Sequence, residues 1–337
     1  FNYLLSSYML LVLLFISGFT MLVSGLGANF ELDLKKIIAL STLGQLGFMF
    51  SVLALGEPML AFFHLLMHAL FKALLFMCAG VLIHYLGDCQ DIRGMGGMLN
   101  SLPLTMCFFN ISSMALCGLP FLSGFYSKDM ILEFMLGGYF NVYVFFVFYI
   151  SVGLTVSYSV RLMYYTMFSS YSGMALNLIA DSSLVMLNSM GGLIGFVMLG
   201  GSIISWVVFP TPYFICLSLT IKLSVLMALM VGGWLGYFCF YINHSDLCKS
   251  ILFYNVFWGI STMFYLNYLS TFGINYYFLR AGGQVYKNFD QGWFEYYGSQ
   301  NLFKILKGNS MLMQRIYYGN LKMFMVLLMI WVCFFFF

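Results

Sequence analysis

Seven apolar runs, each long enough to cross a lipid bilayer, follow one another along most of the chain. A transmembrane helix needs about 20 predominantly apolar residues, and only 7% of the 337 residues are charged. Soluble domains carry about 25% charged residues, so the pattern excludes a soluble protein and predicts a polytopic membrane protein. The runs cover residues 3–28, 37–55, 59–85, 102–136, 139–168, 184–209 and 214–242.

The predicted fold class is all-α, a bundle of transmembrane helices. We expect residues 1–168 to form a five-helix unit and residues 169–250 to add two spans. Residues 251–279 are uncharged but rich in Tyr, Asn, Ser and Thr, which predicts a surface connector that does not span. Residues 280–315 are too charged to span, and their interleaved aromatic residues predict a lateral amphipathic helix segment. Residues 316–337 then form a C-terminal anchoring span.

Glycines and basic residues refine this topology. Glycines at positions 282, 283, 292, 298 and 308 argue against one unbroken helix in the lateral segment. When the joint carrying Lys35 and Lys36 is placed on the positive side, all but three of the 14 Lys and Arg residues fall on that side. The exceptions are Lys72, Lys128 and Lys222, each of which lies within an apolar run.

Lys72 lies at the middle of the third run. An ammonium at that depth costs about 3 kcal/mol or more, and such residues usually have a function. His64, His68 and Lys72 are spaced by four residues, so they form one ridge on a helix. Imidazole exchanges protons near physiological pH, and burial penalises the charged form of a lysine. The ridge is therefore a candidate ladder of exchangeable protons.

Other interpretations of these residues stay open. Polar side chains can hydrogen-bond between helices and serve only to hold them together. His64 and His68 can also bind zinc, although no third ligand and no catalytic glutamate accompany them. Lys222 lies about nine residues into its run, and its ammonium can extend to the membrane surface instead of facing the interior of the helix bundle.

The fourth run contains a predicted helix break. Pro120 has no N–H, so the carbonyl of Leu116 lacks its helical donor, and Gly118 and Gly124 loosen the backbone on both sides. Broken helices at mid-membrane line polar cavities and mark ion sites in transporters. Lys128 follows this break directly, which makes it a second candidate proton carrier, although a simple packing kink remains the alternative.

Further polar residues can take part in proton movement. Asp129 and Glu133 can pair with Lys128 or release its proton. Hydroxyl and amide side chains in the neighbouring runs can hold water between these groups. They are Thr20, Ser24, Ser41, Thr42, Gln45, Asn110, Ser112, Ser113 and Tyr158.

No motif in the sequence indicates redox, nucleotide or metal chemistry. The eight cysteines form no C-x-x-C pair and lie mostly in apolar runs, so we interpret them as small buried hydrophobic residues. The glycine-rich loop at residues 94–97 follows no predicted strand and does not indicate a nucleotide site. With 14 basic against 11 acidic residues and no basic cluster, nucleic-acid binding is excluded. We expect no metal, no cofactor and no catalytic centre in this chain.

Several motifs resemble those of the antiporter-like subunits of respiratory complex I. The resemblance is close over residues 33–133 and rests on hydrophobicity and topology alone after Arg161. The lateral segment and the final span add to it. The motifs are residues 33–42 with 45–47 (DLKKIIALST and QLG), 64–73 (HLLMHALFKA), 90–93 (QDIR) and 118–129 (GLPFLSGFYSKD).

That family has two inverted five-helix repeats, a long lateral helix and a last anchoring helix. The resemblance implies that residues 1–168 are one antiporter-like proton-channel repeat. It also implies that His64, His68 and Lys72 belong to a central hydrophilic axis, with Lys128 as the terminal lysine at the broken helix. The family's first repeat, with its own glutamate–lysine pair, is not among these residues. A separate polypeptide or a longer form of this chain would supply it.

The resemblance implies a function, partners and a location. The function is that of a proton-translocating, non-redox subunit of NADH–ubiquinone oxidoreductase in the mitochondrial inner membrane, with the basic joints facing the matrix. NADH, FMN, iron–sulfur clusters and ubiquinone are expected in other subunits. Expected partners are the other membrane-arm and accessory subunits and lipids such as cardiolipin. A cation/proton antiporter subunit and a purely structural membrane anchor are the alternative functions.

Overall fold

The computed structural model describes residues 5–138, 141–173, 179–211, 214–242 and 254–336. Within these ranges the chain is helical and has no strand, apart from one isolated antiparallel bridge between Asp33 and Asp91. The all-α prediction is therefore confirmed. The chain divides into two compact units, residues 1–264 and residues 265–337.

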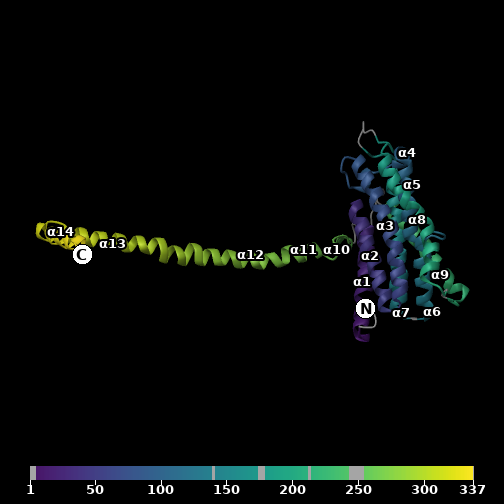
Figure 1. Cartoon of the computed structure of the whole chain (residues 1–337), viewed down its shortest axis with the longest axis horizontal. Coiled ribbons are helices and arrows are strands. Elements are labelled where there is room, and N and C mark those ends of the chain that lie inside the picture. The colour runs from purple at the N-terminus through teal and green to yellow at the C-terminus, as the bar shows by residue number, and fades with distance from the viewer. Residues whose placement is uncertain (1–4, 139–140, 174–178, 212–213, 243–253, 337) are drawn as a thin grey trace. The chain divides into compact units, whose positions relative to one another are not determined.

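Among the described residues of the first unit, six helices are long and apolar enough to span a membrane. They lie side by side as a bundle (Figure 1), as the polytopic pattern predicts. Short helical turns at Ile92–Gly94 and α4 (Met98–Ser101) follow the third helix, and α10 (Tyr254–Ser261) ends the unit. The six are α1 (Ser7–Phe30), α2 (Leu34–Ala54), α3 (Pro58–Tyr85), α7 (Val142–Met163) with its π turn (Tyr164–Phe168), α8 (Leu184–Val208) and α9 (Leu219–Ile242).

The fourth apolar run is split into two helices, α5 (Pro103–Cys117) and α6 (Ser123–Gly138), at the position where the sequence predicts a break. Gly118 ends α5 with a positive φ of 85°, a conformation that favours glycine. Phe121 also has a positive φ, of 71°. At Gly124 a Cβ atom would collide with the carbonyl group of Ala115, so α6 starts in direct backbone contact with α5.

Small residues allow other helices of the bundle to approach closely. Gly232 and Gly236, one turn apart on α9, face the backbone of Gly153 and Ser157 on α7, where a Cβ atom would have no room. Gly47 on α2 lies against α1 in the same way. This close packing brings the polar side chains of several helices within hydrogen-bonding reach of one another.

Two of the motifs that carry the family resemblance meet at one end of the bundle. The Leu34 N–H donates to the Gln90 carbonyl at 2.9 Å, which joins the start of α2 to the loop after α3. Arg161 on α7 is buried there and donates to the carbonyls of Ala28 (3.3 Å) and Glu31, so it caps the C-terminal end of α1. The predicted basic joints at residues 35–36, 93 and 161 therefore belong to one end of the first unit, whereas Lys249 lies outside the described residues.

The loop after α3 contains an ion pair between Arg93 and Asp91. The Arg93 guanidinium contacts the Asp91 carboxylate at 2.6 Å. Its hydrogen bonds lower the pKa of the Asp91 carboxyl group below the usual value. Both side chains are largely exposed, so the pair contributes little to overall stability.

In the second unit, one helical run extends from Leu266 to Tyr317 and is followed by α14 (Leu321–Phe336), bent by 118° from it (Figure 1). The expectation that glycines interrupt the lateral segment is wrong, because the helix continues through Gly282, Gly283 and Gly308 and, in two π turns, through Gly292 and Gly298. A glycine costs a helix only about 1 kcal/mol. The parts of this run are α11 (Leu266–Tyr268), a π turn (Leu269–Gly273), α12 (Ile274–Val285), a π turn (Tyr286–Trp293), a π turn (Tyr296–Gln300) and α13 (Asn301–Tyr317).

The long helix begins earlier than the sequence indicates. Its first residue, Leu266, falls inside the expected surface connector at 251–279 rather than at residue 280. Of that connector, residues 251–253 lie outside the described residues. That the connector at residues 251–279 does not cross the membrane stays a prediction.

The interpretation of the cysteines as buried residues is correct for Cys78 and Cys117 only. Cys89 is half-buried, and Cys248 lies outside the described residues. A small apolar side chain suits the outer surface of a membrane helix as well as its core, so hydropathy alone does not separate the two. Four cysteines are exposed on the chain: Cys107, Cys216, Cys239 and Cys333.

Candidate functional site

Two buried lysines define a polar region inside the first unit. Lys72 on α3 and Lys128 on α6 each expose only 4% of their surface. Two unpaired ammonium groups in an apolar interior would be very costly. The surrounding polar atoms therefore decide what each lysine can do.

Lys72 is held by neutral oxygen atoms of α2. Its Nζ donates to the Ser41 hydroxyl and, at 3.5 Å, to the Ile38 carbonyl. The Ser41 hydroxyl in turn donates to the same Ile38 carbonyl at 2.7 Å. No carboxylate of the described chain forms an ion pair with Lys72.

Lys128 is held in a similar way at the helix break. Its Nζ donates to the Thr155 hydroxyl on α7 at 2.9 Å and to the Leu116 carbonyl at 3.3 Å. This carbonyl is the one that Pro120 deprives of a helical donor. The lysine therefore occupies the position that the break creates. Gly118 lies beside this side chain, since a Cβ on Gly118 would be in van der Waals contact with Lys128 at 3.5 Å.

His64 connects the two regions. Its Nδ1 lies 3.0 Å from the Ser127 hydroxyl, next to Lys128, and its Nε2 lies 3.2 Å from Oε1 of Gln45 on α2. With the Gln45 oxygen as acceptor, Nε2 carries the proton and Nδ1 accepts from Ser127. A neutral imidazole thus satisfies both contacts, and the ring also packs edge-on against Phe48 at 5.1 Å.

His68 extends the predicted ridge without joining this hydrogen-bond network. Its ring centroid lies 6.3 Å from that of His64 and 5.3 Å from that of Phe71. Its Nε2 is buried and has no hydrogen-bond partner in the described chain. No group of three or more His, Cys, Asp or Glu side chains gathers as metal ligands would, among the residues searched.

Asp129 and Glu133 do not pair with Lys128. Glu133 faces Lys222 on α9, with 3.8 Å between Oε1 and Nζ. The Lys222 side chain is 65% exposed, and it lies in the first turn of α9 rather than nine residues into a helix. These three residues form a separate, partly exposed charged group beside the buried site.

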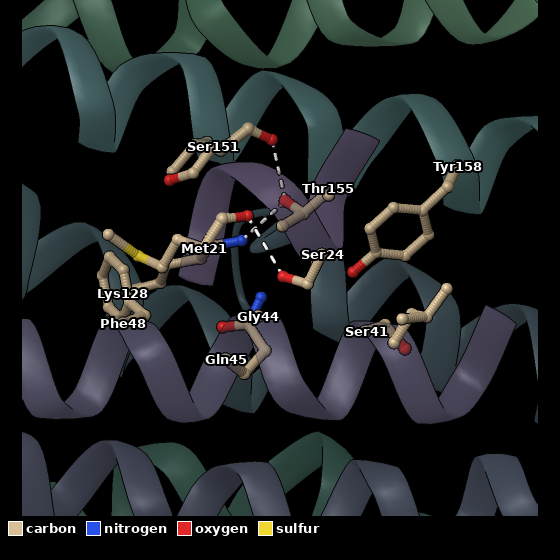
Figure 2. Close-up of a pocket in the computed structure, with 13 residues that line it drawn as sticks. Met21, Ser24, Ser41, Gly44, Gln45, Phe48, Lys128, Ser151, Thr155 and Tyr158 are labelled. Carbon is tan, nitrogen blue, oxygen red and sulfur yellow. Dashed lines mark hydrogen bonds between the residues drawn. The ribbon is translucent and has the colours of Figure 1, made fainter. Parts of the chain in front are cut away.

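A polar cavity lies between the residues that hold the two lysines (Figure 2). Lys128 and Thr155 line one part of it, and Ser41, which binds Lys72, lines another. The free volume of the cavity is about 10 Å³, which is close to what one water molecule needs. The remaining lining residues are Met21, Ser24, Gly25, Leu40, Gly44, Gln45, Phe48, Ser151, Val152 and Tyr158.

Sequence reasoning found both lysines, His64, Ser41 and Gln45 but missed Thr155 and Ser127. The Thr155 hydroxyl donates to the Val152 carbonyl three residues earlier in its helix, and the Ser127 hydroxyl lies 3.3 Å from the Gly124 carbonyl, to which it can donate as an alternative to His64. Such hydroxyls are common in transmembrane helices, so neither stands out locally. The helical spacing of Ser151, Thr155 and Tyr158 is a signal that could have found the polar face of α7.

The broken helix and the buried lysines define a class of protein, the antiporter-like membrane proteins. The fold is similar to a chain of the membrane-bound sulfane sulfur reductase, an archaeal respiratory membrane complex, with a TM-score of 0.53 and 20% identity over 68% of this chain and 44% of that one. It is also similar to a chain of the Mrp complex from Dietzia sp., with a TM-score of 0.52 and 19% identity over 69% of this chain and 49% of that one. The model of the NADH:quinone oxidoreductase/Mrp antiporter transmembrane family matches residues 1–155.

The family itself is shown by the remaining comparisons. The model of the NADH dehydrogenase subunit 5 C-terminus matches residues 158–337, and the chain belongs to the NADH dehydrogenase subunit 5 family. NADH-ubiquinone oxidoreductase chain 5 of Aedes aegypti is 49% identical over 95% of this chain and 55% of its own length. The proteins of the same name from Anopheles gambiae and Locusta migratoria are 48% and 45% identical, over 97% and 95% of this chain and 57% and 56% of their own lengths.

These matches confirm the family resemblance and correct its extent. The similarity does not end in hydrophobicity alone after Arg161, because the C-terminal family model covers almost everything from residue 158 onward. Aromatic and aliphatic residues replace one another easily in membrane helices, so a single sequence does not show this similarity. The chain spans a little over half the length of the curated relatives that it matches.

Proposed function

We propose that this chain translocates protons as a non-redox membrane-arm subunit of NADH–ubiquinone oxidoreductase in the mitochondrial inner membrane. The observation that carries the proposal is the pair of buried lysines, each bonded only to neutral oxygen atoms, on either side of a polar cavity. A carboxylate partner would hold such a lysine permanently charged. Without one, each lysine can release and take up a proton.

The two lysines act in turn in this proposal. A proton leaves the ammonium of one lysine, crosses the polar cavity and binds the neutral amine of the other. Because like charges repel strongly in a poorly solvated interior, charge on Lys72 disfavours charge on Lys128. A proton that arrives at one lysine therefore promotes release from the other, which gives the movement a direction when a neighbouring subunit supplies the charge.

The partners follow from the same proposal. Electron transfer through NADH, FMN, iron–sulfur clusters and ubiquinone takes place in other subunits, and this chain supplies no catalytic centre of its own. Residues 280–315 lie along neighbouring membrane-arm and accessory subunits, with lipids such as cardiolipin between them. Their exposed aromatic residues, Trp293, Phe294 and Phe303, are suited to such contacts.

Replacement of Lys72 by Met tests the function. The side chain keeps much of its length and loses its exchangeable protons, so the assembled complex should form and pump fewer protons, with the pumping rate reduced about tenfold or more. Proton uptake by vesicles during NADH oxidation measures this rate. A purely structural anchor would pump at the normal rate with Lys72→Met. A cation/proton antiporter would lose sodium- or potassium-dependent exchange instead of NADH-driven pumping.

The proposed orientation predicts the labelling of one cysteine. Cys89 is half-buried in the loop after α3. This loop is hydrogen-bonded to the start of α2, at the end of the first unit that carries Lys35 and Lys36. That end should face the matrix. A membrane-impermeant thiol reagent should therefore modify Cys89 in inverted inner-membrane vesicles and leave it unmodified in sealed mitoplasts. Modification in mitoplasts would reverse the orientation.

A further inference from the structure

The hydroxyl group of Tyr158 has no role in the site as described above. Tyr158 is 3% exposed and lies one turn after Thr155 on α7. Its hydroxyl oxygen is buried near the side chains of Ser41 and Gln45, but it makes no hydrogen bond of normal geometry with either of them. It points into the polar cavity on the side of Ser24 and Ser41 (Figure 2). Buried hydroxyls are nearly always hydrogen-bonded to protein or to internal water.

The cavity offers such a partner. It has room for about one water molecule, and the hydroxyls of Ser24 and Ser41 and the amide of Gln45 lie in its wall among apolar side chains. An internal water needs two to four polar partners, roughly the number available there. The site is therefore built to hold one water molecule against the Tyr158 hydroxyl.

We propose that the Tyr158 hydroxyl and one water molecule beside it carry protons between Ser41, which holds Lys72, and Lys128. This inference rests on the proposed function. Lys72 does not itself line the cavity, so Ser41 stands between Lys72 and the Tyr158 hydroxyl. On the far side Lys128 lines the cavity, and the water molecule lies between it and the Tyr158 hydroxyl in this proposal.

The transfer balances in protons and charge. Lys72 gives a proton to the Ser41 oxygen while the Ser41 hydroxyl proton moves to the Tyr158 oxygen. The tyrosine hydroxyl proton moves to the water, and the water passes one proton on to the Lys128 amine. One N–H bond breaks at Lys72 and one forms at Lys128, and every hydroxyl ends neutral. Because Ser41 donates to the Ile38 carbonyl at 2.7 Å, its hydroxyl must first turn toward the cavity. That rotation makes Ser41 a gate.

Tyr158→Phe removes the hydroxyl and keeps the ring. In the assembled complex, we expect the rate of NADH-driven proton pumping to fall about tenfold, the effect of one lost hydrogen bond on a barrier. The solvent deuterium isotope effect on pumping should rise, because proton transfer becomes rate-limiting. A structural role would leave that isotope effect unchanged. Tyr165→Phe is the matched control, since Tyr165 is equally buried on the same helical run but does not line the cavity.

Gly44→Ala tests the water independently. A Cβ on Gly44 would lie 2.8 Å from the Ser24 hydroxyl and would take up the free space of the cavity. We expect the same loss of pumping rate as in Tyr158→Phe, with normal assembly. Gly80→Ala on α3 is the control, because a Cβ there meets no atom within 4 Å.

The outcomes separate this inference from the function on which it rests. If Lys72→Met and Lys128→Met lose pumping while Tyr158→Phe or Gly44→Ala pumps at the normal rate, the relay is wrong and the proposed function stands. If the lysine variants pump normally, the proposed function fails first. A Tyr158→Phe variant that does not assemble would make the hydroxyl structural and would also contradict the relay.

Discussion

Replacing Lys128 by Met should stop most proton pumping while leaving the assembled complex intact. The expected loss is about 100-fold, within the range for removal of a proton-transfer group. Methionine fills the same space beside Gly118 and has no proton that must be donated to the Thr155 hydroxyl or the Leu116 carbonyl. The fold should therefore tolerate the change, because an ammonium in this position must be solvated and a thioether need not be.

Lys222→Met is the matched control for this experiment. Lys222 is also a lysine in an apolar run, but its side chain is 65% exposed and it faces Glu133 at 3.8 Å. Exposed ion pairs contribute little to stability, and this one lies outside the hydrogen-bond network of the two buried lysines. Pumping by Lys222→Met should match the unmodified complex. Equal losses in Lys222→Met and Lys128→Met would show that any lysine replacement disturbs the subunit.

Gly124→Ala should prevent stable assembly. The added Cβ would collide with the backbone of Ala115, and backbone cannot move aside as the end of a side chain can. The start of α6 would have to shift away from α5, at a cost of about 3 kcal/mol or more. That shift would also displace Ser127 and Lys128, which lie within the next turn. We expect the amount of assembled complex in the membrane to fall severalfold, measured by native gel electrophoresis.

Gly195→Ala provides the comparison for Gly124→Ala. Gly195 lies on α8, and a Cβ there meets no atom within 4 Å. Alanine is also the better helix former by about 1 kcal/mol. Assembly should therefore be normal or slightly improved. A normal level of assembly with Gly124→Ala would show that α5 and α6 are not packed backbone to backbone.

Local chemistry explains which parts of the site could be predicted. The ridge of His64, His68 and Lys72 depends only on helical spacing, and the break at Pro120 depends only on a missing N–H. Both features are decided within a few residues, so one sequence suffices. The same holds for the apolar runs that became the helices of the bundle.

Contacts between helices explain what could not be predicted. Thr155 is 27 residues from Lys128 in the sequence, and nothing near either residue indicates that α7 packs against the broken helix. Asp129 and Glu133 are close to Lys128 in sequence, yet they face away from it toward α9. Proximity in the sequence was a misleading guide here, because residues one and five positions after a helical residue lie on other faces.

The glycines of the lateral segment show a third kind of error. Five glycines in 36 residues argue against a continuous helix, but Gly292 and Gly298 are accommodated in π turns. Helix propensity is a weak effect that neighbouring residues outweigh. Helix propensity also does not predict that the long helix starts at Leu266.

The most direct test of the account is the number of protons pumped per NADH oxidised, compared between Lys72→Met and Lys128→Met in vesicles. If the two lysines are successive stations on one path, blocking either station removes the same protons. The ratio should then fall by the same amount in both variants and fall no further when both replacements are combined. A normal ratio in either variant, or a larger fall in the double variant than in the singles, would contradict a single path through both lysines.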